Sequence, residues 1–196
     1  MLLKLLYKYY SKHGWNTFVR ILSLVLIRGN RKQEWLHLCG LEIGEGSELS
    51  CGISAFPEPY MVTIGKKVYV ATDVVFMTHD GALSWMSRAL GYTDKRTDKI
   101  GSIVVKDNCF IGAKAIIMQN VTIGNNCIVG MGAIVTKDIP DNSVVAGVPA
   151  KVVCTTEQYL KKYKECKDYT CGWPFDKKRE YYEKKYCIVH QSKDSI

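Results

Sequence analysis

Apolar residues recur every six positions along the middle of this chain. The inner set comprises Ile64, Val70, Phe76, Val105, Ile111, Ile117, Ile123, Val129 and Val135. Four positions after most of them stands a small or short residue: Val68, Val74, Cys109, Ala115, Val121, Cys127 and Ala133. A helix repeats every 3.6 residues and a strand every two, so neither explains a period of six. Short strands joined by tight turns do, and three such units form one coil of a triangular parallel β-helix, with coils about 4.8 Å apart.

The period breaks between Phe76 and Val105, whose spacing of 29 residues is not a multiple of six. A solenoid accepts an insertion only as an external loop, which we place at residues 79–102, and such loops often carry function. His79 stands at the root of this loop. A side chain held by rigid coil on one side is well placed to react.

A length of 196 residues fits about one domain with flanking segments. We expect a basic amphipathic N-terminal segment at 1–38, the β-helix at 39–153 and a helical cap and tail at 154–196. Thr155 and Gln158 have the spacing of a capping box, which predicts a helix start. This C-terminal segment is expected to cover the last coil, whose open edge would otherwise invite further strand pairing.

The net charge of +8 belongs mainly to one segment. Seven of the 27 Lys and Arg residues lie in residues 1–33, which contain no acidic residue, so the remaining chain is nearly neutral. A nucleic-acid module would carry its basic surface on the fold itself, which argues against one here. The segment either packs as a helix on the body or rests on an anionic membrane face. Its apolar run at 21–27 is too short to span a bilayer, and its layout is not that of a signal peptide.

The eight cysteines are scattered and match no standard zinc spacing. We interpret them as free thiols, which indicates a reducing cytoplasm.

The stretch "DNCFIGAKAIIMQNVTIGNNCIVGMGAIVTKDIPDNSVVAGVPAKVV", residues 107–153, resembles the hexapeptide-repeat acyltransferases. Its ending is typical of the branch with galactoside, maltose and capsular-polysaccharide O-acetyltransferases. "THDG" at the loop root is most similar to the polysaccharide and lipopolysaccharide enzymes of that branch. The resemblance implies an all-β solenoid, specifically a left-handed parallel β-helix, assembled as a homotrimer. It also implies acetyl-CoA as the donor and active sites between neighbouring subunits.

The resemblance and the chemistry agree on His79 as the catalytic base. Imidazole removes a proton at neutral pH, as acyl transfer to a hydroxyl requires, and no covalent acyl-enzyme is needed. The plainer alternative is that His79 only closes a turn. Asp80 either orients the ring or begins the loop, and we favour the second because adjacent residues in a strand point apart.

Five positions correspond to the family's cofactor-binding residues. Ala113 and Met131 match positions along the pantetheine groove, although the family usually has a smaller residue at Met131. Thr136 and Lys137 match residues near the nucleotide, and Lys151 is a second candidate for a CoA phosphate. Each lysine has an alternative as a solvated surface residue.

Three residues are candidates for the acceptor site. Glu58 falls near an acidic substrate-contacting position of the galactoside enzyme. Trp85 would stack on a sugar ring or anchor the loop. Arg88 would meet a phosphate or carboxylate on the acceptor.

These observations predict an acetyl-CoA-dependent O-acetyltransferase that acts on a sugar hydroxyl in polysaccharide or lipopolysaccharide biosynthesis, with a lipid-linked saccharide as a possible acceptor. N-acetylation of an amino sugar and transfer of another acyl group stay open. A zinc-dependent γ-class carbonic anhydrase needs three converging histidines, and the repeat region has one, so we expect no metal. A non-catalytic scaffold would leave His79 without a purpose.

Overall fold

The computed structural model describes residues 2–13, 27, 31–162 and 168–188. It divides into two compact units, Met1–Leu160 and Lys161–Ile196. The first unit contains the repeat region and every residue singled out above.

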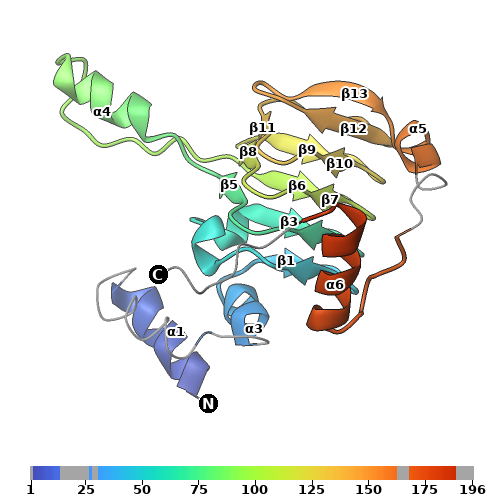
Figure 1. The fold of residues 1–196 in the computed structure, drawn as a ribbon. Coiled ribbons are helices and arrows are strands. Elements are labelled where there is room, and N and C mark those ends of the chain that lie inside the picture. The colour runs from blue at the N-terminus through green and yellow to red at the C-terminus, as the bar shows by residue number, and fades with distance from the viewer. Residues whose placement is uncertain (1, 14–26, 28–30, 163–167, 189–196) are drawn as a thin grey trace, which may run out of the picture. The chain divides into compact units, whose positions relative to one another are not determined.

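Three sheets, here called A, B and C, form the sides of the coil, and their strands pair in parallel except for the last strand of sheet B (Figure 1). Sheet A contains β1 (Glu42–Ile43), β3 (Val62–Ile64), β6 (Ile103–Val105) and β9 (Val121–Ile123). Sheet B contains β2 (Glu48–Leu49), β4 (Tyr69–Val70), β7 (Phe110–Ile111), β10 (Ile128–Val129), β12 (Ser143–Ala146) and β13 (Lys151–Thr155). Sheet C contains β5 (Val75–Met77), β8 (Ile116–Met118) and β11 (Ile134–Val135).

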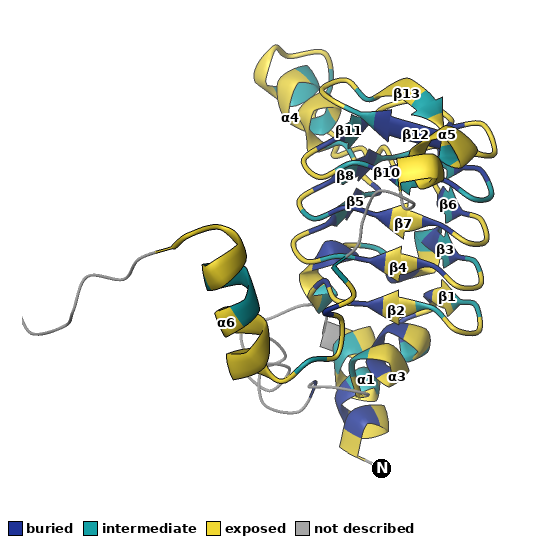
Figure 2. Ribbon diagram, turned by 45° about the vertical axis from the view of Figure 1, so that its right-hand side comes forward, coloured by how far each residue is buried: buried dark blue, intermediate teal, exposed yellow. Residues whose placement is uncertain are grey.

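The sixfold pattern sets the register between coils. Ile111 pairs with Val129 in sheet B, and Ile117 pairs with Val135 in sheet C. All nine inner residues of the pattern are at most 1% exposed, and they form one continuous core through the stack (Figure 2). The predicted parallel coil with inward apolar residues is therefore confirmed.

The corner between sheets A and B, here the AB corner, is a ladder of asparagines. Asn108, Asn126 and Asn142 adopt the left-handed backbone conformation, with φ of 57° to 59°. The Asn108 amide donates to Asn126 at 3.1 Å, and the Asn126 amide donates to Asn142 at 2.8 Å. Asparagine tolerates this conformation better than other side chains do, which explains its recurrence at this turn.

The far end of the stack closes by a reversal of chain direction. β13 pairs antiparallel with β12 and completes the edge of sheet B. The predicted capping box follows: Thr155 N–H donates to the Gln158 side chain at 2.9 Å, and Gln158 N–H donates to the Thr155 hydroxyl at 3.2 Å. It begins the short helix α5 (Thr156–Lys161). The first cover of the last coil is therefore a strand, which the periodicity did not predict.

The near end is covered by helices. α1 (Leu2–His13) and α3 (Arg31–Leu38) share a small apolar cluster around Trp35. Two 3₁₀ turns, η1 (Ile53–Ala55) and η2 (Pro59–Met61), take the place of a strand in the first coil. Lys32 donates to the carbonyls of Leu49 and Cys51, which lie at the open edge of β2.

Between β5 and β6 the chain leaves the coil and returns, and it forms an arm that points away from the sheets (Figure 1). The arm carries helix α4 (Gly81–Ala89), which has no buried residue. The predicted excursion thus contains a regular element.

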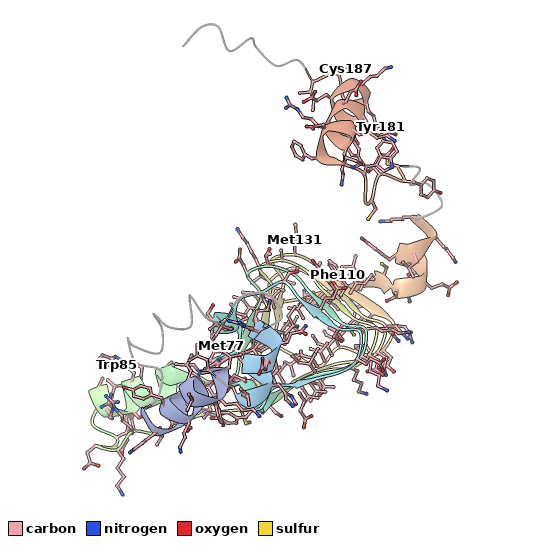
Figure 3. The ribbon with its side chains drawn as sticks, turned by 90° about the horizontal axis from the view of Figure 1, so that it is seen from below. Met77, Trp85, Phe110, Met131, Tyr181 and Cys187 are labelled. Carbon is pink, nitrogen blue, oxygen red and sulfur yellow. The ribbon has the colours of Figure 1, made fainter. Side chains whose placement is uncertain are left out.

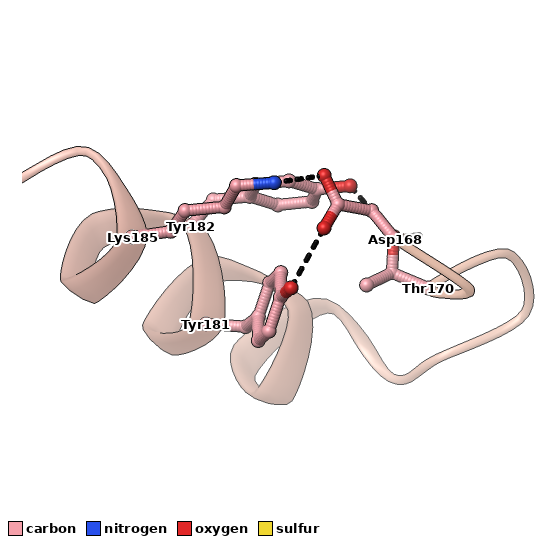
Figure 4. Close-up of polar contacts among 5 residues, drawn as sticks. All are labelled: Asp168, Thr170, Tyr181, Tyr182 and Lys185. Atoms are coloured by element: carbon pink, nitrogen blue, oxygen red, sulfur yellow. Dashed lines mark hydrogen bonds and ion pairs between the residues drawn. The ribbon is translucent and has the colours of Figure 1, made fainter. Parts of the chain in front are cut away.

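The second unit contains α6 (Phe175–Lys185). Asp168 accepts a hydrogen bond from the Tyr181 hydroxyl at 2.7 Å and pairs with Lys185, while Thr170 and the Tyr182 hydroxyl lie 2.8 Å apart (Figure 4). The Lys185 ammonium, followed by Tyr181, lowers the pKa of Asp168. These contacts tie the chain before α6 to the helix. They involve none of the predicted site residues.

The described cysteines form no disulfide; they are Cys39, Cys51, Cys109, Cys127, Cys154, Cys171 and Cys187.

Candidate active site

The root of the arm is a short antiparallel ladder that fixes His79. Gly101 N–H donates to the Thr78 carbonyl at 2.8 Å, and Asp80 N–H donates to the Lys99 carbonyl at 2.9 Å. His79 itself is bridged to Ile100. Because β5 ends two residues earlier, the imidazole stands where the rigid coil meets the arm.

The carboxylate of Glu58 holds the imidazole. Nδ1 of His79 lies 3.0 Å from Oε2 of Glu58, and the same oxygen accepts a hydrogen bond from the fully buried Thr78 hydroxyl. The Glu58 side chain is 20% exposed and that of His79 is 45% exposed. The pair is thus anchored on one side and open to solvent on the other.

An aromatic stack brings these two segments together. Phe56 and Phe76 lie with ring centroids 4.8 Å apart and planes 11° apart, and both are buried. Phe56 precedes Glu58 by two residues, and Phe76 precedes His79 by three. The core contact therefore sets the distance between carboxylate and imidazole.

The geometry defines the protonation state that suits a base. A carboxylate accepts from Nδ1–H, so the neutral ring carries its proton on Nδ1 and leaves the lone pair of Nε2 to accept one. The same carboxylate stabilises the imidazolium formed when that proton arrives. In this arrangement, Nε2 of His79 is chemically able to accept a proton.

Asp80 does not take part in this pair. Its side chain accepts from Ala82 N–H at 3.0 Å, as an N-cap of α4, and lies 3.3 Å from Lys99 Nζ. The Ala82 N–H, and then Lys99, lower the pKa of Asp80. This arrangement agrees with the interpretation that Asp80 begins the loop.

A cavity of about 580 Å³ opens beside His79. Its walls are the Glu58–His79 pair, one face of α4 and the segment of the arm that returns to the coil. The lining residues are Glu58, Tyr60, His79, Asp80, Gly81, Ser84, Trp85, Arg88, Arg96, Thr97, Asp98, Lys99 and Ile100. All three predicted acceptor residues therefore line one cavity with His79.

Trp85 and Arg88 face this cavity from α4. Trp85 is 67% exposed, and it lies on the arm, well apart from Phe110 and Met131 on the coil (Figure 3). Arg88 is half-buried, and its Nε lies 3.4 Å from the Ser84 carbonyl oxygen. No carboxylate partner is found for Arg88 or Arg96 within the described part of the chain.

Glu58 was predicted as a substrate contact, and its role as the partner of His79 was missed. The two residues are 21 positions apart, and Glu58 lies where the first coil departs from the repeat. The only local signal was its place between Pro57 and Pro59, which stiffens the segment.

The predicted cofactor residues lie at three places on the coil. Ala113 and Met131 occupy the corner between sheets B and C, here the BC corner, where Gly132 N–H donates to the Ala113 carbonyl at 2.9 Å. Met131 is 79% exposed. A Cβ on Gly112 would lie 2.6 Å from the Met131 nitrogen, so this corner requires glycine there.

Thr136 and Lys137 follow β11, at the corner between sheets C and A, here the CA corner, from which the arm also departs. They lie two coils from His79, which is about 10 Å along the stack. Lys151 begins β13 and is exposed. Within one chain, Ala113 and Met131 lie where the strands of sheet C begin, whereas His79 lies where they end.

Gln119 is a further polar residue at the CA corner. It follows Met118, which pairs with Met77, so it lies one coil beyond Thr78. Its Oε1 is buried and has no hydrogen-bond partner among the described residues. A buried acceptor without a partner is rare in folded proteins.

No group of three or more His, Cys, Asp or Glu residues in the described ranges is arranged to hold a metal ion. None of the described helices is both long and apolar enough to cross a membrane.

Comparison with known proteins adds to this geometry. Residues 102–137 match the family described as bacterial transferase hexapeptide (six repeats). Protein CapG of Staphylococcus aureus is 39% identical over 176 residues, which cover 89% of this chain and 96% of CapG. The chain belongs to the hexapeptide-repeat transferases. This membership confirms the predicted acyltransferase class.

Two further relatives bear on the fold and the branch. The galactoside O-acetyltransferase of Escherichia coli K12 is 37% identical over 114 residues, which cover 55% of this chain and 53% of that protein. A maltose O-acetyltransferase structure from Clostridium difficile 630 superposes with a TM-score of 0.53 at 21% identity, over 79% of this chain and 88% of that one. The second likeness concerns the fold alone.

Proposed function

We propose that the chain is an acetyl-CoA-dependent O-acetyltransferase that acts on a sugar hydroxyl in polysaccharide or lipopolysaccharide biosynthesis. The observation that carries this proposal is the imidazole of His79, held through Nδ1 by Glu58 and facing a cavity of about 580 Å³. The galactoside O-acetyltransferase among the relatives supports a sugar hydroxyl as the acceptor. A thioester-using enzyme rich in free thiols fits the cytoplasm.

In the proposed reaction, Nε2 of His79 accepts the proton of the acceptor hydroxyl as its oxygen attacks the acetyl carbon. The new C–O bond forms and the C–S bond breaks. The proton then passes from His79 to the departing sulfur of CoA, which restores the neutral ring. Glu58 stabilises the imidazolium between these two events, and no bond to the enzyme is formed.

The donor would lie along the corners of the coil. The BC corner offers backbone groups beside Ala113, whose own side chain is small, which suits the thin pantetheine arm. Thr136 and Lys137 would meet the nucleotide end, and Lys151 would pair with a phosphate as a point charge. The exposed Met131 narrows this groove compared with the family's usual smaller residue.

A complete site would combine two chains. Because Ala113 and Met131 lie across sheet C from His79, the BC corner of one chain has to meet the CA corner of a neighbour. We propose that the chain forms a homotrimer of left-handed β-helices in which each cleft lies between subunits. Size measurement at micromolar concentration is expected to give about 67 kDa, three times the 22.2 kDa chain. A monomer that still turns over would contradict this arrangement.

The acceptor would bind against the arm. Trp85 offers a flat surface for the C–H face of a sugar ring, and Arg88 with Arg96 offers two guanidinium groups for a carboxylate or phosphate. These contacts would leave one hydroxyl at Nε2 of His79.

Thiol release from acetyl-CoA, measured against a panel of sugars, amino sugars and lipid-linked oligosaccharides, tests the proposal. We expect release that depends on a hydroxyl acceptor and an ester product that is labile to mild base. An amide product would identify N-acetylation instead. If thiol is released with none of the acceptors, from acetyl-CoA or from a longer acyl-CoA, the result would favour a non-catalytic scaffold.

A further inference from the structure

Helix α1 has two apolar faces. One packs inside the molecule: Leu3 and Leu6 are buried, and Tyr7 and Tyr10 lie with ring centroids 6.3 Å and 5.8 Å from that of Trp35. This face joins α1 to α3. Packing as a helix, one of the two alternatives left open for the N-terminal segment, describes this face of α1, while residues 14–26 and 28–30 lie outside the described residues.

The other apolar face points outward. Leu2 is 54% exposed, Leu5 is 56% exposed and Tyr9 is 38% exposed. Their spacing of three and four residues places them on one side of the helix. Packing against α3 thus leaves part of the apolar surface of α1 exposed.

A row of lysines runs beside this outward face. Lys4, Lys8 and Lys12 follow one another at intervals of four residues, and all are exposed. No acidic residue occurs in residues 1–33. An exposed apolar strip next to a basic strip is the arrangement by which helices lie in the interface of an anionic bilayer.

We propose that α1 docks this outward face on a membrane surface of anionic phospholipid, with Leu2 and Leu5 at the acyl boundary and the three lysines among the headgroups. A second copy of the chain is a poorer occupant, because a symmetric contact between two α1 helices would bring two lysine rows together. The charge complementarity of an anionic leaflet has no such conflict.

The inner face of α1 connects this surface with the candidate active site. Tyr10 lines a hollow of about 310 Å³ together with Pro57 and Pro59. Glu58 lies between those two prolines and holds His79. A docked α1 would therefore bring the segment that carries Glu58 close to the lipid surface, where an acceptor attached to a lipid would be presented.

Co-sedimentation of the full chain with vesicles tests the proposal without reference to acetyl transfer. One set of vesicles is pure phosphatidylcholine, and the other contains about one third phosphatidylglycerol. We expect binding only to the anionic set at about 0.05 M salt, and release at about 0.5 M, because salt screens the headgroup charge.

Variants separate the two halves of the surface. Lys4→Gln/Lys8→Gln/Lys12→Gln is expected to lower vesicle partitioning about 100-fold, and Leu2→Ser/Leu5→Ser at least about tenfold. The matched control is Lys66→Gln/Lys67→Gln/Lys106→Gln, which removes the same charge from exposed positions at the AB corner and is expected to bind as the parent does.

Three results would overturn the proposal. They are no binding of the parent chain to anionic vesicles at low salt, equal binding to neutral vesicles, and equal losses in the α1 and AB-corner lysine variants. A change of oligomeric state in Leu2→Ser/Leu5→Ser would assign the face to a second copy instead. Because the substituted side chains are exposed, circular dichroism of both variants is expected to match the parent.

Discussion

The AB corner and the CA corner turn the same chain between sheets, but they treat their polar groups differently. At the AB corner, each turn repeats the previous one, and Asn108, Asn126 and Asn142 bond to one another. At the CA corner, the turn after β8 is short, whereas the turn after β5 becomes the arm. There the imidazole of His79 meets a carboxylate and keeps one nitrogen for other partners.

This difference shows where a repeat protein places its chemistry. A corner whose side chains satisfy one another in a ladder has few polar groups left without a partner. A corner that leaves the repeat brings together residues of different types. The following predictions test whether the two corners divide stability and catalysis in this way.

The largest effect is expected at the base. His79→Ala should lower the rate of acetyl transfer at least about 100-fold, the low end for loss of a general base, because it removes the group proposed to take up the hydroxyl proton. Thiol release under saturating acetyl-CoA measures the change. His37→Ala, an exposed histidine on α3, is the control, and unchanged activity in His79→Ala would end the assignment.

The partner of the base should matter next. Glu58→Gln is expected to lower kcat about 30-fold, or about 2 kcal/mol of transition-state stabilisation, because a neutral amide stabilises the imidazolium less well. The KM for acetyl-CoA should stay within about twofold of the parent.

Glu58→Asp should recover part of the kcat that Glu58→Gln loses, since it restores the charge. Glu48→Gln, an exposed glutamate on β2, should be silent. If Glu58→Gln raises KM for the sugar and spares kcat, Glu58 contacts the acceptor, as the sequence alone suggested.

Substitutions at the AB corner should lower stability and leave activity unchanged. Asn126→Ala removes two side-chain hydrogen bonds and places alanine at a φ of 57°, so we expect a loss of about 1.5 kcal/mol in the free energy of unfolding. Asn126→Gly, which accepts this φ, should lose less. Urea titration measures both, and activity of the folded variants should equal that of the parent; a fall in kcat would break the division between the corners.

The smallest effect is expected at the start of α4. Asp80→Ala removes the N-cap, so the amides of the first turn of the helix should exchange with solvent severalfold faster while the coil stays unchanged. The pKa of Asp80 is lowered, so its stabilising contribution is present above the ordinary carboxyl range and is lost as the pH falls through the lowered pKa.

Hydrogen exchange of the parent, corrected for the intrinsic effect of pH on exchange, should therefore show the same loosening of α4 once the pH falls below the lowered pKa of Asp80. If the amides of the first turn of α4 exchange as slowly in Asp80→Ala as in the parent, contacts other than the N-cap hold the helix.

The coil was predictable because burial in it depends on a local rule. Each inner residue follows from its position in the period, as the near-complete burial of Val70 and Ile123 shows. The contact between Glu58 and His79 follows from no such rule, since it depends on how two irregular segments meet. Helix α4 had a readable signal that was treated as loop: Leu83, Met86 and Leu90 at helical spacing, then Gly91 with a φ of 73°.

The arm also has a consequence for how such enzymes diversify. Val62 of β3 pairs with Ile103 across 41 positions, whereas Ile103 pairs with Val121 across 18. Because the entropy of closing a loop grows only with the logarithm of its length, the longer connection costs about 0.7 kcal/mol more. Insertions at this one turn can therefore lengthen, shorten or replace the acceptor-facing wall with little loss of stability. The coil that positions His79 would stay the same throughout. New acceptor preferences can therefore evolve while the β-helix is retained.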